Sequence, residues 1–253
     1  MIQQITDHIH WLQIPFYNIC TSAFIIETDE GNILYDTATT SQDVDTYLLP
    51  ALKQLGEPVC TVLSHRHSDH TGGLQRLVHH YPATQVCAGS RTEGETIRLL
   101  AEGDCVLGPV RAVAIPGHTL DCIGLWDRRT DTLLTGDGLQ LYGVEGCGKW
   151  GVNIPYVQEH LCCLEKLKQL PVERLIASHS YHPLGYQAEG QAQLQAYYAQ
   201  CEKALYHLAG FIRTHSCQEN KALAEAYRAE TGLPAIGENI IANMKKRMKE
   251  GVI

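Results

Sequence analysis

Residues 64–73 of this 253-residue chain are Ser64-His65-Arg66-His67-Ser68-Asp69-His70-Thr71-Gly72-Gly73. This stretch contains four side chains that can bind a metal ion, in the pattern His-x-His-x-Asp-His. Burying them in a core would require a separate polar partner for each. A solvated polar loop is the ordinary alternative, and further candidate ligands elsewhere in the chain argue against it. We therefore predict a metal site at this stretch.

The candidate ligands follow predicted strands. Residues 59–63 form a short, apolar, β-branched run, typical of a buried strand, and lead directly into the His-x-His pattern. Loops at strand ends are common sites in α/β proteins, because the sheet fixes where each loop begins. Three more candidates follow predicted strands: His118 after 110–115, Asp137 after 132–134 and His179 after 174–178.

The spacing of these ligands predicts two metal positions. The two histidines of His-x-His alternate along an extended segment and can reach one ion, whereas the Asp-His pair lies beyond them and can turn toward a second. A carboxylate can bridge two cations and keep a favourable charge, and each ion would retain room for a shared water or hydroxide. The predicted ligands are His65, His67 and His118 for the first ion, and Asp69, His70 and His179 for the second, with Asp137 bridging.

The rest of the chain divides into two regions. Strand-like and helix-like patterns alternate up to about residue 186, with helices predicted at 43–55, 74–80 and 157–170. From residue 187 onward helix formers dominate. We therefore expect a site-bearing domain over residues 1–186 and, over residues 187–253, a C-terminal helical extension packed on it.

Composition limits the function classes. Hydrophobic residues make up 44% of the chain, which excludes a disordered protein. The net charge of −8 argues against nucleic acid as a partner. We expect no membrane association, because no run of about 18 apolar residues occurs. The first residues lack the basic start and apolar run of a signal peptide, so we predict a cytoplasmic protein.

The ordered motifs resemble the metallo-β-lactamase superfamily over roughly residues 5–185. Besides the ligands above, the resemblance includes Asp36 after a strand and Pro-Gly-His-Thr around His118. It implies an α/β fold, a four-layer αββα sandwich of two mixed β-sheets flanked by helices. It also implies that Asp36 orients the metal loop without binding an ion, and that Asp69 accepts a hydrogen bond or proton from the nucleophile.

The all-His/Asp ligand set is similar to that of glyoxalase II and lactonases. It implies hydrolysis of a thioester, ester or lactone of a small molecule by a hydroxide shared between two divalent ions. Zn²⁺ is the expected metal, and iron or manganese would suit the same ligands. Three other functions stay open: a persulfide-dioxygenase-like oxidoreductase with mononuclear iron, a phosphodiesterase, and a ligand-binding or sensor protein with low turnover.

Some assignments have named alternatives. The last histidine of the pattern lies in Ser178-His179-Ser180, where the family usually has glycines, so His182 is an alternative to His179. We prefer His179 because it directly follows the strand end. The C-terminal helices could pack on the sandwich, cover the site or pair in a homodimer. The candidate substrate-binding residues, each equally compatible with ordinary loop packing, are Tyr17, Tyr142, Lys149, Trp150, Tyr156 and His182.

Overall fold

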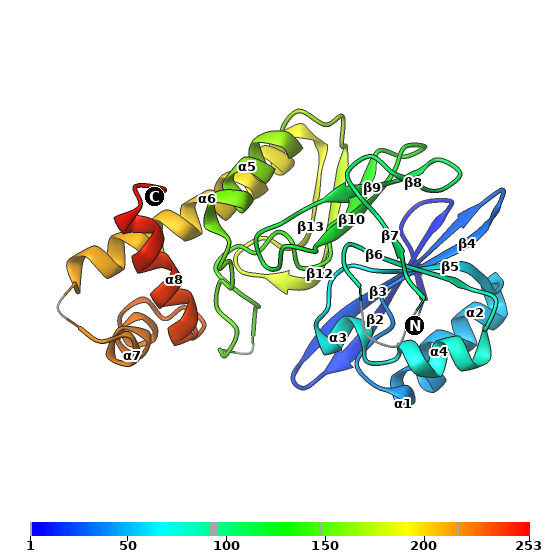
Figure 1. Cartoon of the computed structure of the whole chain (residues 1–253), viewed down its shortest axis with the longest axis horizontal. Helices are drawn as coiled ribbons and strands as arrows, with labels where there is room; N and C mark the ends of the chain where they lie inside the picture. Colours follow the sequence, from blue (N-terminus) through cyan, green and yellow to red (C-terminus); the bar gives the residue numbers. More distant parts are fainter. Residues whose placement is uncertain (1, 92–95, 147, 217) are drawn as a thin grey trace.

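The computed structural model describes residues 2–91, 96–146, 148–216 and 218–253. The strands of these residues form two mixed sheets, one of seven strands and one of six, with helices on their outer faces (Figure 1). This arrangement confirms the predicted αββα sandwich, and a helical C-terminal region follows it.

The first sheet is built from the N-terminal part of the chain. Its first four strands form an antiparallel meander, and the pairs from β4 to β7 are parallel. Parallel pairing of β4 and β5 brings their carboxyl ends to one edge, where Asp36 and the His-x-His loop begin. In sheet order the strands are β1 (Ile2–Gln4), β2 (Ile9–Phe16), β3 (Ile19–Thr28), β4 (Gly31–Tyr35), β5 (Pro58–Leu63), β6 (Gln85–Ala88) and β7 (Arg98–Leu99).

The second sheet follows in sequence. Only β11 and β12 pair in parallel among its described strands; the other pairs are antiparallel. Strand β13 lies at one edge of this sheet. The helix after it begins at Gly190, three residues later than residue 187, where the helical extension was predicted to begin. In sheet order the strands are β13 (Gly185–Glu189), β12 (Arg174–Tyr181), β11 (Thr132–Leu134), β10 (Ile123–Asp127), β9 (Val110–Ala114) and β8 (Cys105–Leu107).

The helices agree closely with the predicted ones. Thr40 begins the first through a capping box with Asp43. The predicted helix 43–55 is continuous but contains a π-helical turn, and α5 ends at Leu167, three residues before the predicted end. The helices are α1 (Ser41–Asp43), η1 (Val44–Leu48, the π-helical turn), α2 (Leu49–Leu55), α3 (Ser68–Thr71), α4 (Leu74–His80), α5 (Val157–Leu167), α6 (Gly190–Thr214), α7 (Asn220–Thr231) and α8 (Glu238–Lys249).

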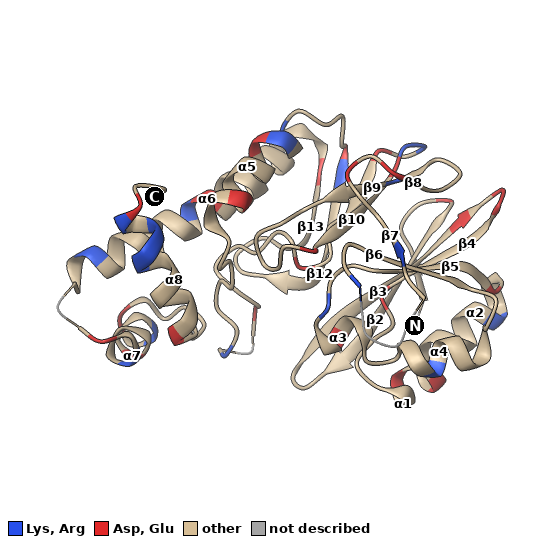
Figure 2. Cartoon of the chain, in the orientation of Figure 1, with Lys and Arg blue, Asp and Glu red and all other residues tan. Residues whose placement is uncertain are grey.

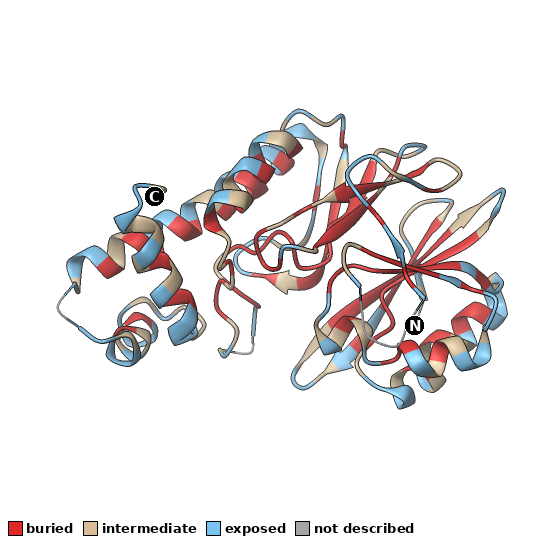
Figure 3. Cartoon of the chain, in the orientation of Figure 1, coloured by how far each residue is buried: buried red, intermediate tan, exposed pale blue. Residues whose placement is uncertain are grey.

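Alternation along the strands produces the layers. In β3, Phe24 faces the other sheet and shares a core with Leu125 of β10, whereas its neighbour Ile25 packs against Leu48 and Leu52 of the outer helices. On the far side, α5 and α6 cover the second sheet through a further apolar cluster. Figure 3 shows the buried residues concentrated on the strands and on the inner faces of these helices.

The C-terminal helices extend beyond the sheets. Helices α7 and α8 lie at the far end of α6 (Figure 1) and share an apolar core with it. Val152, Ile154 and Val157, which follow Asp137 along the chain, belong to this same core. Lysine and arginine positions colour part of the α8 ribbon blue in Figure 2. The side chains of Lys246 and Arg247 pair with Glu250. No helix in the described part of the chain has the length and apolar character that a membrane crossing requires.

Candidate metal centre

Three histidines form a first group of ligand atoms. His65 follows β5, His67 precedes α3 and His118 follows β9. Nδ1 of His67 lies 3.0 Å from Nε2 of His65 and 2.8 Å from Nε2 of His118. His118 donates its Nδ1 proton to the carbonyl oxygen of Asn153 at 2.8 Å, so its Nε2 carries a lone pair. The ring nitrogens therefore converge in a way that suits a cation.

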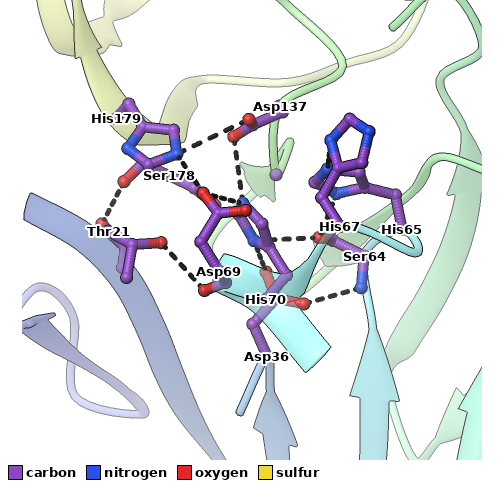
Figure 4. Close-up of polar contacts among 12 residues, drawn as sticks. Thr21, Asp36, Ser64, His65, His67, Asp69, His70, Asp137, Ser178 and His179 are labelled. Atoms are coloured by element: carbon purple, nitrogen blue, oxygen red, sulfur yellow. Dashed lines mark hydrogen bonds and ion pairs between the residues drawn. The ribbon is translucent and has the colours of Figure 1, made fainter. Parts of the chain in front are cut away.

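A second group lies beside the first (Figure 4). Nε2 of His179 is 3.2 Å from Oδ2 of Asp69 and 3.5 Å from Oδ2 of Asp137. Nε2 of His70 is 3.4 Å from Oδ2 of Asp69 and 3.6 Å from Oδ1 of Asp137. Oδ2 of Asp137 also lies 3.9 Å from Nε2 of His118, so this carboxylate borders both groups.

Buried atoms without partners indicate that a cation fits this second group. Nε2 of His70 and Oδ1 of Asp137 are both buried and make no hydrogen bond. Unpaired buried polar atoms are rare because their desolvation is uncompensated. Within each group the ligand atoms all lie within 4.8 Å of one another, and a divalent ion would satisfy them. Imidazole and carboxylate donors of this kind suit zinc, iron or manganese.

The two groups differ in protonation. Burial lowers the pKa of both His65 and His118. Burial would also lower the pKa of His70, but Asp36 and Asp137 outweigh it and hold that pKa well above the ordinary value. In His179, likewise, Asp137 and Asp69 outweigh burial and raise the pKa. In the metal-free protein, His70 and His179 of the second group therefore favour the charged imidazolium form, whereas His65 and His118 of the first group favour the neutral form.

The carboxylates of the second group are charged. Burial alone would raise the pKa of Asp137, but the neighbouring His179 and His70 outweigh it and lower that pKa well below the ordinary range. Burial alone would also raise the pKa of Asp69, but its contacts with His179 and His70 outweigh burial and lower that pKa. Both side chains are therefore carboxylates near neutral pH, as ligands for a divalent ion must be.

Asp36 orients His70 of the second group through a hydrogen bond. It follows β4 with a φ of 67°, in the left-handed region that few residues other than glycine adopt. Its Oδ2 accepts the Nδ1 proton of His70 at 2.7 Å, and its Oδ1 accepts the backbone N–H of Ser64 at 2.7 Å. Asp36 therefore fixes both the imidazole ring and the start of the metal loop, which accounts for its strained backbone.

The structure places His179, and not His182, in the second group. His179 points inward from β12 and donates its Nδ1 proton to the carbonyl oxygen of Cys20 at 2.8 Å. His182 is exposed, and its ring lies beside Tyr142 with centroids 6.4 Å apart. The serines in place of glycines fit the strand, since Ser178 is buried and Ser180 donates to Glu145 at 2.7 Å.

A cavity of about 420 Å³ opens onto both groups. Lys149 and Trp150 line it, as does Phe16, whose ring stacks on Trp150 with centroids 5.4 Å apart. Tyr17 stands beside Trp150 but is largely exposed and is not in the lining. The remaining predicted substrate-binding residues are not in the lining: Tyr142 packs on His182 and His207, His182 faces outward, and Tyr156 holds the Gly117 carbonyl through its backbone N–H.

Several parts of the lining were not predicted, among them Phe16, and two more are Gln140 and a segment near α8. Gln140 is buried beside His118, and its Oε1 accepts the backbone N–H of Asn153 at 2.8 Å. Its position three residues after Asp137 is the only sequence signal for it. The second part, residues 235–240, comes from the start of α8 and contributes Ala235, Gly237, Asn239 and Ile240. The backbone N–H of Gly151 donates to the carbonyl oxygen of Ala235 at 2.8 Å, which joins this segment to the cavity wall.

Sequence comparisons relate part of this chain to a known family. Residues 21–94 match the family model described as the metallo-beta-lactamase superfamily. A hydroxyacylglutathione hydrolase of Yersinia enterocolitica is 33% identical over 129 residues, which are 49% of this chain and 49% of that protein. The uncharacterised protein YobT of Bacillus subtilis is 27% identical over 53% of this chain and 70% of its own.

Solved structures share the fold. The metallo-beta-lactamase FIM-1 from Pseudomonas aeruginosa, in its mono-zinc form, superposes with a TM-score of 0.62 and 19% identity, over 81% of this chain and 95% of its own. At this identity the likeness concerns the fold alone. The sequence match to the hydroxyacylglutathione hydrolases spans about half of their length.

Proposed function

This chain belongs to the metallo-beta-lactamase superfamily, and on that premise we propose that it is a hydrolase dependent on two divalent metal ions, most simply Zn²⁺. The observation that carries the proposal is the pair of ligand groups bordered by one carboxylate, Asp137. A structural zinc site needs a single closed set of four ligands, whereas these groups face a cavity large enough for a small molecule.

The chain's own residues have defined roles in this proposal. When bound, two divalent ions supply an activated water at neutral pH and polarise the carbonyl group of a substrate. Asp69 borders the cavity as a charged carboxylate, so it can accept a hydrogen bond from the attacking water and orient it. Asp36 keeps His70 oriented throughout, because its bond to Nδ1 leaves Nε2 directed at the site.

We propose a thioester, ester or lactone of a small molecule as the substrate. The cavity has apolar and polar walls in similar proportion, which suits an acyl group attached to a polar carrier. The name hydroxyacylglutathione hydrolase, carried by the Yersinia relatives, denotes cleavage of an acyl group from a thiol carrier and supports the thioester among these three.

The proposal is tested by metal content and turnover in one preparation. Protein purified without added metal is analysed by plasma mass spectrometry and assayed against panels of acyl thioesters, esters and lactones. We expect close to two zinc ions per chain and hydrolysis of at least one panel member. The Asp137→Asn variant should lose turnover, because the amide cannot provide the charge that both groups share. The Asp29→Asn variant, an exposed carboxylate with the same charge change, is the control.

Other outcomes would replace the proposal. One iron per chain together with oxygen consumption on a persulfide would favour a dioxygenase. Cleavage of phosphodiesters and not of acyl compounds would favour a phosphodiesterase. Two bound ions with no turnover on any panel would favour a ligand-binding or sensor protein.

A further inference from the structure

A short segment of β3 contacts the strand that carries His179. His179 donates its Nδ1 proton to the carbonyl oxygen of Cys20 at 2.8 Å. Two residues further along β3, the hydroxyl of Ser22 donates to the carbonyl oxygen of Ser178 at 2.7 Å. The first bond selects the tautomer of the imidazole, and the second fixes the backbone one residue before it. Residues 20 and 22 belong to the first sheet, and they thus hold His179, which belongs to the second sheet.

The residue between them contacts the other side of the same ligand group. Thr21 directs its hydroxyl at the backbone carbonyl of Asp69, at the longer distance of 3.4 Å (Figure 4). Asp69 and His179 face each other across 3.2 Å, Oδ2 to Nε2. Three consecutive residues of β3 therefore lie against both segments that border the second ion position.

The direction of the Ser22 hydroxyl is fixed. Trp11 of β2 donates its indole N–H to Ser22 Oγ at 2.9 Å. An indole nitrogen can only donate, so the hydroxyl accepts this bond and must give its own proton to Ser178. All three residues are buried, Trp11 at 5% exposure and the two serines at 1% or less. Water does not compete for these bonds, and the chain from Trp11 to Ser178 has a single orientation.

The first ligand group is held by other parts of the chain. His118 is oriented by the carbonyl oxygen of Asn153 at 2.8 Å, and Nδ1 of His65 lies 3.0 Å from the Ser64 hydroxyl. Neither contact involves β3. A change confined to residue 22 therefore acts on one ion position and leaves the supports of the other in place.

We propose that Ser22 is a positioning residue for the second ion position, acting through Ser178 to hold Nε2 of His179 on its ligand site. This inference rests on the proposed two-metal function and adds to it a residue outside the ligand set. Contacts of this kind behind a ligand typically change metal affinity 10- to 100-fold.

Two variants of equal shape separate the hydroxyl from packing. Ser22→Thr keeps the hydroxyl and Ser22→Val replaces it with a methyl group, so any crowding by the added carbon is common to both. Metal-free full-length protein is titrated with zinc against a chromophoric chelator, and with cobalt while its visible absorption is recorded. We expect Ser22→Val to weaken the second binding step 10- to 100-fold relative to Ser22→Thr, with the first step unchanged within twofold.

A matched control lies on the same strand. Thr28 donates its hydroxyl to the carbonyl oxygen of Gly31 at 2.7 Å, the same type of bond at the far end of β3. Thr28→Val should leave both binding steps unchanged. Equal affinities in Ser22→Val and Ser22→Thr, or equal weakening of both steps, would refute this inference alone. A single binding step in the unmodified protein would refute the two-metal proposal and this inference with it.

Discussion

Asp36 and His70 form a fully enclosed pair, with 2.7 Å between the carboxylate Oδ2 and the imidazole Nδ1. The pair joins the end of β4 to α3 and directs Nε2 of His70 toward Asp69 and Asp137. Its charge also raises the pKa of His70 against the effect of burial. Asp36, which lies outside the candidate ligand groups, thus sets both the orientation and the basicity of His70.

Replacing Asp36 with Asn should weaken the second ion position. The amide oxygen can still accept one hydrogen bond, but its NH2 group cannot accept the second, and the side chain lacks the charge that raises the pKa of His70. We expect zinc affinity at the second step to fall 10- to 100-fold in chelator competition. The exposed Asp29→Asn change should leave both steps unaltered. An equal effect of the two variants would contradict the role given to Asp36.

Metal binding should release protons unequally. The pKa of His70 and that of His179 are raised above the ordinary value of 6.5, so these side chains hold protons near neutrality in the metal-free protein. Burial lowers the pKa of His65 and His118, which are already neutral. We expect the second binding step to release more protons, and its affinity to rise as the pH increases through the raised pKa values. Calorimetric titration in buffers of different ionisation enthalpy measures this, and equal release in both steps would refute it.

His179 and His182 should differ sharply when each is replaced with alanine. His179→Ala removes a ligand atom that lies 3.2 Å from Asp69, so the protein should retain one zinc ion and lose hydrolysis. His182→Ala removes an exposed ring outside the cavity lining and should retain two ions with near-normal turnover. Mass spectrometry under native conditions counts the ions. The reverse result would make His182 the ligand.

Two aromatic residues of the same loop provide a test of the cavity. Trp150 lines it beside Phe16, whereas Tyr142 packs on His207 away from the lining. Trp150→Ala should lower kcat/KM for an acyl thioester about tenfold, equivalent to about 1.4 kcal/mol, mainly through KM. Tyr142→Ala should change kcat/KM less than twofold. An equal loss of kcat/KM in both variants would mean that Trp150 does not contact the substrate.

Two glycine-to-alanine changes test how the C-terminal segment is attached. A Cβ on Gly151 would lie 2.7 Å from the carbonyl oxygen of Pro234 and 2.8 Å from a side-chain carbon of Ile236. We expect Gly151→Ala to lower the free energy of unfolding by about 1–3 kcal/mol. Gly210 lies within α6 with open space around it, so Gly210→Ala should raise that free energy by about 0.5–1 kcal/mol. Denaturant unfolding measures both, and stabilisation by Gly151→Ala would show that the segment is not held there.

The sequence predicts well whatever depends on local pattern. The apolar, β-branched run 59–63 indicates the strand β5, and helical spacing indicates α4 with both ends correct. Ligands that follow strands, such as His65 and Asp137, can be assigned to one site because strand ends converge in an α/β fold. The π-helical turn at Val44–Leu48 is not predictable in this way, since its apolar spacing resembles that of an α-helix.

Contacts between distant segments were beyond prediction. Ser22 and Ser178 are 156 positions apart, and serine is too common to signal a partner. The acceptor opposite His179 is the main-chain carbonyl of Cys20, which every residue type provides. Trp150 and Tyr142 look equivalent in sequence, and only the packing of α6 against the loop separates them. Strand β13 was missed because only Tyr186 and Ala188 alternate as apolar residues within it.

Each sheet is contiguous in sequence, the first within residues 2–99 and the second within residues 105–189. The candidate ligands are divided between these halves: His65, His67, Asp69 and His70 come from the first, and His118, Asp137 and His179 from the second. Neither half can complete an ion position alone. A bound ion would therefore fasten the halves together, and at a free concentration 100 times its Kd would add about 2.7 kcal/mol against their separation. A variant with a lower affinity for the ion should therefore also require less free energy to separate its two sheets.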